Sequence, residues 1–252
     1  MRQDISIPTP EGAMRAFVFT PDAGAGPWPA AILAMDGVAI RPAMFEMGER
    51  LAGGGYYVLL PDLFWRSGAY APLDAGKIAA GDTQETQRLY KMFGALTPDQ
   101  QMADVKACLA FLDGQPKARA DKVGITGYCM GGGVALRAAG TFPDRIAAAA
   151  SFHGGRMATD DAASPHLMAP RIKAKVLVAG ADEDASFDPA EKDRLAAALA
   201  EARVDAEVSI WKGLRHGWVP TDVKAYDAQG AERHWQALFK LFEETLKSPQ
   251  PA

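Results

Sequence analysis

The sequence predicts an α/β protein with a mainly parallel central sheet and helices on both faces. Continuous apolar runs, such as residues 30–35 and 175–179, are typical of strands that are buried on both sides. Segments with helical spacing of apolar residues lie between such runs, as at residues 98–112. Strands that alternate with helices form parallel sheets through right-handed crossovers, so the order of these patterns indicates the fold class.

The remaining elements follow from the same periodicities and from glycine and proline positions. We expect further extended segments at residues 4–8, 14–20, 56–60, 123–128, 146–151 and 207–211. We expect helices at residues 43–52, 83–93, 134–139, 189–203 and 226–246. With 252 residues and 48% hydrophobic content, the chain is predicted to form one domain over 1–252. Residues 62–97 lack a clean period and are predicted to form a lid or an irregular segment.

Composition argues against several classes of protein. The net charge of −4 and the scattered lysines and arginines offer no basic stripe for a nucleic acid. No apolar run is long enough to span a membrane, and the first residues lack the apolar core of a secretory signal, so a cytoplasmic protein is expected. Cys108 and Cys129 lie far apart, which indicates neither a disulfide framework nor a cysteine zinc site.

The most informative stretch is residues 123–133, VGITGYCMGGG. A strand that leads through a glycine-flanked nucleophile into a helix is the pattern of a nucleophile elbow, with Cys129 at its apex. Gly127 and Gly131 supply room where a Cβ atom would collide. The amino end of the following helix favours a thiolate and can hold an oxyanion. A small apolar residue buried beside a turn is the alternative interpretation of Cys129.

Candidates for an acid and a base follow the cysteine in chain order. Asp182 comes after an apolar strand, 53 residues beyond Cys129 (182 − 129), with Glu183 and Asp184 beside it as rivals. His216 follows 34 residues later (216 − 182) on a loop flanked by glycines, a setting that makes core packing a weaker explanation than it is for a histidine on an apolar helical face. His153 also follows a strand and could line the cleft.

Four motifs together resemble the dienelactone hydrolase family of α/β-hydrolases, over almost the whole chain. They are Pro61-Asp62-Leu63-Phe64, Gly-Tyr-Cys-Met-Gly-Gly at 127–132, Ala179-Gly180-Ala181-Asp182 and His216-Gly217-Trp218. The resemblance implies an α/β-hydrolase fold, a Cys129-His216-Asp182 triad and an oxyanion hole from the backbone N–H groups of Met130 and Gly37. It also implies acyl transfer on a small ester or lactone, as in carboxymethylenebutenolidase, with no metal or organic cofactor.

Two departures from the family pattern concern the thiol and the substrate. Asp36 stands where the founding members have a glutamate that positions the thiol, and Pro220 stands where they have an arginine that binds the substrate carboxylate. Arg88 could supply an anion contact instead, as could Arg66 or Arg156.

The expected cleft wall is aromatic and only lightly cationic, because it would draw on Phe64, Trp65, Tyr70 and Trp218. From this we expect neutral esters or lactones to react better than carboxylated ones. The alternative function is a thiol-reactive detoxifying or sensing protein on the same fold, and a binding module is a third possibility. The expected partner is a small molecule, without nucleic acid or membrane, and the protein is expected to be a monomer or a small homo-oligomer.

Overall fold

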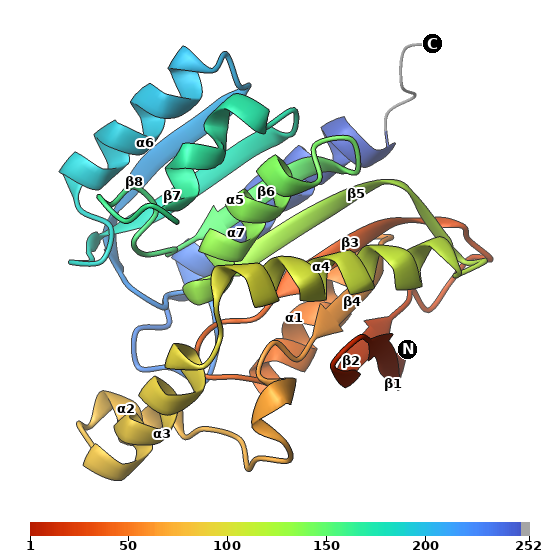
Figure 1. The fold of residues 1–252 in the computed structure, drawn as a ribbon, viewed down its shortest axis with the longest axis horizontal. Helices are drawn as coiled ribbons and strands as arrows, with labels where there is room; N and C mark the ends of the chain where they lie inside the picture. Colours follow the sequence, from red (N-terminus) through yellow and green to blue (C-terminus); the bar gives the residue numbers. More distant parts are fainter. Residues whose placement is uncertain (248–252) are drawn as a thin grey trace.

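The computed structural model describes residues 1–247, and its centre is an eight-stranded sheet in the order β1-β2-β4-β3-β5-β6-β7-β8 (Figure 1). Strands β3 to β8 are parallel, whereas β1 and β2 form an antiparallel hairpin at one edge. The strand bounds are β1 Arg2–Thr9, β2 Gly12–Phe19, β3 Trp28–Ala34, β4 Tyr57–Pro61, β5 Ala118–Tyr128, β6 Ile146–Phe152, β7 Lys175–Glu183 and β8 Ala206–Arg215. The predicted fold class is therefore confirmed.

The helices cover both faces of the sheet. Helices α4, α5 and α6 share one face, where α5 contacts β5 and β6, while α1 and α7 cover the other (Figure 1). The helix bounds are α1 Pro42–Gly53, α2 Ala75–Ala79, α3 Thr83–Gly94, α4 Pro98–Asp113, α5 Met130–Thr141, α6 Pro189–Glu201 and α7 Ala228–Phe242. Short 3₁₀ turns occur at Trp65–Ser67 and Pro165–Arg171, and a π-type turn at Glu243–Lys247 follows α7.

The differences from the sequence prediction are local. Strand β8 continues to Arg215 rather than ending at Trp211, so it delivers His216 directly to the edge of the sheet. Helix α2 and the 3₁₀ turn at Pro165–Arg171 were not expected, because both are too short to show a period. Residues 62–97 contain α2 and α3, and α3 confirms the helix predicted at 83–93.

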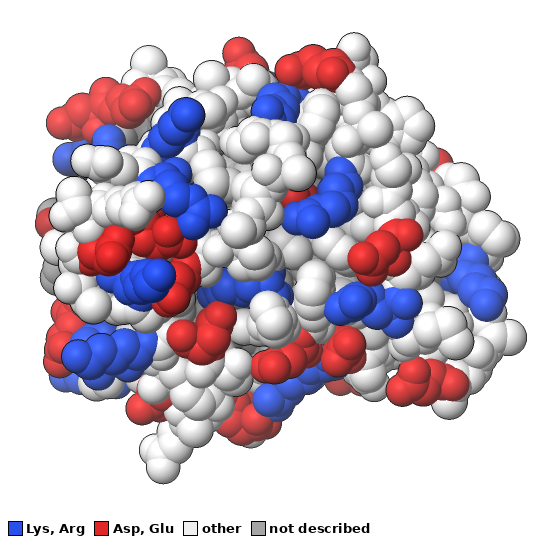
Figure 2. Space-filling view, turned by 90° about the horizontal axis from the view of Figure 1, so that it is seen from below, with Lys and Arg blue, Asp and Glu red and all other residues white. Residues whose placement is uncertain are grey.

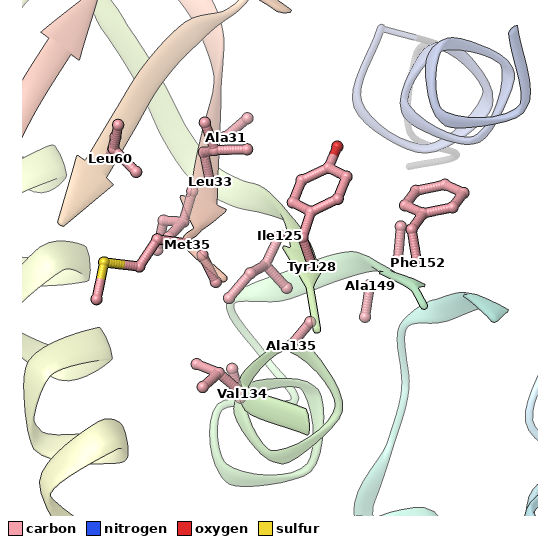
Figure 3. Close-up of a cluster of buried hydrophobic side chains, with 14 of the residues drawn as sticks. Ala31, Leu33, Met35, Leu60, Ile125, Tyr128, Val134, Ala135, Ala149 and Phe152 are labelled. Carbon is pink, nitrogen blue, oxygen red and sulfur yellow. The ribbon is translucent and has the colours of Figure 1, made fainter. Parts of the chain in front are cut away.

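The apolar core fills the space on both sides of the central strands (Figure 3). Tyr128 at the end of β5 and Phe152 at the end of β6 point toward one face, with ring centroids 5.8 Å apart. Val134 and Ala135 of α5 lie on the opposite side of the sheet (Figure 3). Because all four side chains are buried, the turn between β5 and α5 is fixed from both faces.

The surface carries both signs of charge. Lysines and arginines are interspersed with aspartates and glutamates over the face shown in Figure 2, with no continuous basic area. Within residues 1–247 no helix has the length and apolar character that a membrane crossing would require.

Candidate active site

The turn between β5 and α5 has the geometry of a nucleophile elbow. Cys129 adopts φ 53° and ψ −115°, a backbone conformation that a non-glycine residue rarely occupies. A Cβ atom at Gly127 would lie 1.8 Å from the carbonyl oxygen of Gly131, and one at Gly131 would lie 2.3 Å from that of Ala34. Both glycines are therefore required by contacts between backbone segments, as the sequence predicted.

Substitution of Gly131 by valine is expected to prevent correct folding of the elbow. The new side chain would collide with the backbone of β3, which cannot move without disturbing the centre of the sheet. Thermal denaturation and far-UV circular dichroism of Gly131→Val would measure the effect. The control is Gly94→Ala, since a Cβ at Gly94 has nothing within 4 Å. A Gly131→Val protein with unchanged stability would contradict the tight turn.

His216 is held by Asp184, not by Asp182. The Nδ1 atom of His216 lies 2.6 Å from Oδ2 of Asp184, whose other oxygen accepts hydrogen bonds from the backbone N–H and hydroxyl of Ser186. The predicted pairing of Asp182 with His216 is therefore wrong. Asp184 was named from the sequence only as a rival.

Asp182 has a different role at the edge of the sheet. Its two carboxylate oxygens accept hydrogen bonds from the backbone N–H groups of Gly213 and Leu214 in β8. The register between β7 and β8 shifts between Ala181 and Glu183, so the carboxylate of Asp182 joins the two strands there. It supports the strand that carries His216 without touching the imidazole.

Charge stabilises the protonated form of His216. Burial opposes the imidazolium, but the hydrogen bond with Asp184 and the proximity of Cys129 raise the pKa of His216 to about 10. Burial would likewise favour a neutral Asp184, yet the hydrogen bonds from His216 and Ser186 hold the pKa of Asp184 below its ordinary value. The arrangement favours an imidazolium at His216 beside a carboxylate at Asp184.

The pH dependence of stability should report this ion pair. Because the pKa of His216 is raised, its contribution to folding is complete below about pH 6.5, the ordinary histidine pKa, and is lost as pH rises toward 10. The difference in unfolding free energy between the native protein and Asp184→Asn should therefore shrink from neutral pH to about pH 10. Urea unfolding across this range would measure it, and a constant difference would contradict the shifted pKa.

Asp36 is engaged by Arg41 rather than by the thiol. Its oxygens accept hydrogen bonds from Arg41 at 2.7 and 2.8 Å and from the backbone N–H of Val38 at 2.9 Å. The same guanidinium reaches Asp222 at 2.6 and 3.1 Å and is only 3% exposed. Arg41 thus ties the loop after β3 to the loop that follows His216, and the sequence did not reveal it. The predicted thiol contact of Asp36 is not found.

His153 lies beneath the elbow. Its Nδ1 accepts a hydrogen bond from the backbone N–H of Cys129 at 3.1 Å, and its ring centroid is 5.3 Å from that of His216. Burial, together with the nearby charge of His216, lowers the pKa of His153 well below its ordinary value. A neutral imidazole at this position supports the backbone of Cys129.

A hollow of about 410 Å³ contains Cys129 and His216, and we call it the His216-side hollow. Its other walls are mainly aliphatic, with cationic and acidic residues among them. They are formed by Asp36, Val38, Ala75, Ile78, Ala79, His153, Glu183, Arg215, Gly217, Pro220, Val223, Lys224 and Ala225. Of residues 62–97, which were predicted to form a lid, only those of α2 line this hollow.

The predicted aromatic wall is wrong. Phe64 is buried, Trp65 donates to Asp104, and Tyr70 donates to Asp62, so none of them lines the hollow. Trp218 is fully buried and packs against the ring of His153 at 5.0 Å. With these aromatics absent and Arg215 present, the reason for expecting neutral substrates is removed.

Two of the proposed anion contacts are occupied elsewhere. Arg88 pairs with Glu85 at 2.7 Å and donates to the carbonyl of Ala71. Arg66 pairs with Glu11 and with the buried Asp104. Neither guanidinium lines the His216-side hollow, so the prediction that Arg88 contacts the substrate is not supported by its position.

The two predicted oxyanion donors, the backbone N–H groups of Met130 and Gly37, belong to segments that lie next to the elbow. Met130 is the first residue of α5, and the first N–H groups of a helix have no partner within it. The contact of Gly131 with the carbonyls of Ala34 and Met35 brings the loop that carries Gly37 against the elbow. The backbone N–H of Cys129 itself is already bonded to Phe152 and His153.

Comparison with known proteins places this geometry in a family. A relative from Methylorubrum extorquens, provisionally named carboxymethylenebutenolidase, is 27% identical over 96% of this chain and 80% of its own. A structure provisionally titled dienelactone hydrolase, from Klebsiella pneumoniae, has a TM-score of 0.84 at 23% identity and covers 97% of this chain and 98% of its own. A dienelactone hydrolase from Anabaena variabilis has a TM-score of 0.68 at 20% identity, covering 98% of each chain. The family model of the dienelactone hydrolase family matches residues 14–246, and the chain belongs to that family.

Proposed function

We propose that the protein hydrolyses a small carboxylic ester or lactone through an acyl-cysteine intermediate. The observation that carries this proposal is that Cys129 and His216 line one hollow, while Nδ1 of His216 lies 2.6 Å from Oδ2 of Asp184. The family membership and the provisional name of the Methylorubrum relative support the same reaction class.

The proposed reaction has two steps. The Cys129 thiolate attacks the carbonyl carbon, and the N–H groups of Met130 and Gly37 stabilise the oxyanion that forms. His216 then gives its proton to the leaving oxygen as the bond between carbon and oxygen breaks. In the second step His216 takes a proton from water, which attacks the thioester and releases the acid and the thiolate. Asp184 orients His216 throughout.

The experiment is a screen of small esters and lactones against the purified protein. We expect sustained release of 4-nitrophenol from 4-nitrophenyl acetate, beyond one equivalent per protein molecule. A thiol-reactive sensing protein, the alternative, would stop after one equivalent because its acyl-cysteine would persist. A protein that reacts no faster than free cysteine would contradict both functions.

Substitution of Arg41 by methionine is expected to lower kcat more than it raises KM. Arg41 touches neither Cys129 nor His216 through any hydrogen bond found, but it joins the loops that carry Gly37 and His216, and its loss leaves Asp36 buried without a cation. A decrease in kcat of about 10²-fold is the scale for a displacement of about 1 Å in a catalytic group.

Arg50→Met is the matched control, because Arg50 makes a similar ion pair with Glu232 on the surface. Steady-state kinetics on 4-nitrophenyl acetate, with thermal denaturation alongside, would separate an effect on the site from a loss of folded protein. Unchanged kcat in a folded Arg41→Met protein would exclude the positioning role.

A further inference from the structure

A second hollow borders the elbow on the side of Met130, and we call it the Met130-side hollow. It measures about 200 Å³ and shares no lining residue with the His216-side hollow. Met130 and Gly133 of α5 form one wall, and Phe93 of α3 forms another. Phe93 also lies beside Gly37, where a Cβ would be 3.8 Å from its ring. Both residues that supply the proposed oxyanion hole therefore lie next to this hollow.

Arg137 of α5 lines the Met130-side hollow, and it also borders a neighbouring hollow next to Thr141. Side chains on a helix tilt toward its amino end, and Gly133 lies one turn before Arg137. A Cβ atom at Gly133 would be 3.2 Å from Nη1 of Arg137, so the guanidinium lies over that glycine. Met130 is three residues further back, a rise of roughly 5 Å along the helix. The cation is thus about one helical turn from the oxyanion hole.

Arg137 has no carboxylate partner among the described residues. Its Nε and Nη2 donate to the carbonyl of Ala163 at 3.3 and 3.0 Å, and its Nη1 donates to the side chain of Gln101 at 3.3 Å. These bonds leave part of the five-donor guanidinium unused. Burial lowers the pKa of Arg137, against the opposing charge of Asp161. A half-buried cation without an ion pair is the kind of group that an incoming anion stabilises.

Two other charged residues face the same hollow. Arg156 lines it and adds a second positive charge; among the described residues it has no salt bridge within 4.0 Å, although it interacts electrostatically with Glu191. Asp161 also lines it, but its carboxylate is exposed and Oδ1 accepts a hydrogen bond from the backbone N–H of Ala163. The balance is one positive charge (two arginines less one aspartate).

We propose that the Met130-side hollow binds an anionic group on the acyl half of the substrate, with Arg137 as its main contact. This inference rests on the proposed function, because it places the acyl group relative to Cys129. His216 must protonate the leaving oxygen, so the leaving group occupies the His216-side hollow and the acyl group extends toward Met130. The substrate class is therefore an ester or lactone whose acyl part carries a carboxylate or a phosphate a few bonds from the scissile carbonyl. This reverses the preference expected from the sequence.

The test compares kcat/KM for matched pairs of 4-nitrophenyl esters. One pair is the hydrogen glutarate monoester against the neutral glutaramate ester, and a second replaces the carboxylate by a phosphonate to distinguish the two anions. We expect the native protein to prefer at least one anionic ester by about tenfold or more, a difference of roughly 1.4 kcal/mol in transition-state binding. Added salt should reduce the preference.

Variants would show which hollow causes the preference for the anionic ester. Arg137→Gln should abolish it while leaving kcat/KM for the neutral ester within about twofold, and Arg137→Lys should restore part of it. Asp161→Asn should increase it, which provides a test even if Arg137→Gln fails to fold. Arg215→Gln, in the other hollow, is the control and should leave the preference unchanged.

Three results would overturn the inference: no preference for either anion, a preference that survives Arg137→Gln, or one that disappears in Arg215→Gln instead. Because the neutral ester is measured in parallel, failure of the inference is distinguishable from failure of the hydrolase function. Turnover of the neutral ester without an anion preference would remove only the subsite.

Discussion

Cys129→Ala is expected to abolish ester turnover while leaving the thermal stability nearly unchanged. The substitution removes the sulfur on which the proposed acyl intermediate would form, and losses of up to about 10⁶-fold in kcat are the scale for removing a nucleophile of this kind. The backbone turn is held by Gly127, Gly131 and the hydrogen bonds of the Cys129 N–H, none of which involves the thiol. Steady-state turnover of 4-nitrophenyl acetate and a thermal melt would measure both quantities.

Cys108→Ala is the control for this experiment and should behave in the opposite way. Cys108 lies inside α4 with no exposed surface, and burial raises the pKa of its thiol. Its removal should lower stability by a small cavity effect and leave kcat unchanged. A fully active Cys129→Ala protein would exclude the cysteine mechanism.

Asp184→Asn is expected to reduce kcat by on the order of 10⁴-fold, the scale known for the equivalent change in a serine triad. Asparagine keeps the size of the side chain but removes the charge that supports the imidazolium, and it can present its amide to Nδ1 in the wrong tautomer. The pKa of His216 should fall with it, which a histidine NMR titration would detect.

Asp182→Asn provides the comparison that decides between the two acids. Since Asp182 bonds only to the backbone of Gly213 and Leu214 in the contacts found, its variant should retain most of the turnover and lose some stability. If Asp182→Asn were the inactive protein and Asp184→Asn the active one, the observed pairing of His216 would not be the functional one.

Much of the fold could be predicted because the buried parallel strands have continuous apolar sequences and the longer helices have clear periods. The elbow could also be predicted, because the tight turn leaves no room for a Cβ atom at positions 127 and 131 and the sequence has glycine at both. Short elements such as α2 escaped because five residues are too few to show a helical period.

The choice among three adjacent acids could not be made from the sequence. Asp182, Glu183 and Asp184 occupy one strand end, and which of them faces His216 depends on the register shift between β7 and β8. The sequence pattern of β7 is equally compatible with each register. The identity of the acid is thus a property of the strand pairing rather than of the motif.

The contacts of Arg41 and the composition of the cleft wall could not be predicted from the sequence, for a different reason. Arg41 and Asp222 are 181 residues apart, and no local pattern links them. Phe64, Trp65 and Tyr70 follow a strand at the correct edge, but their side chains turn into the protein and its hydrogen-bond network. A position just after a strand at the correct edge of the sheet therefore did not show whether a side chain lines the hollow.

Mass spectrometry of a rapidly quenched reaction would detect the acyl-cysteine intermediate itself. The protein would be mixed with excess 4-nitrophenyl acetate, quenched in acid within the first turnovers and digested with a protease. The mechanism predicts an added acetyl group of about 42 Da on the peptide that contains Cys129, absent in Cys129→Ala and lost again when the substrate is exhausted. Sustained turnover with no acetyl group on Cys129, or with an acetyl group on another residue that turns over at the catalytic rate, would exclude Cys129 as the nucleophile.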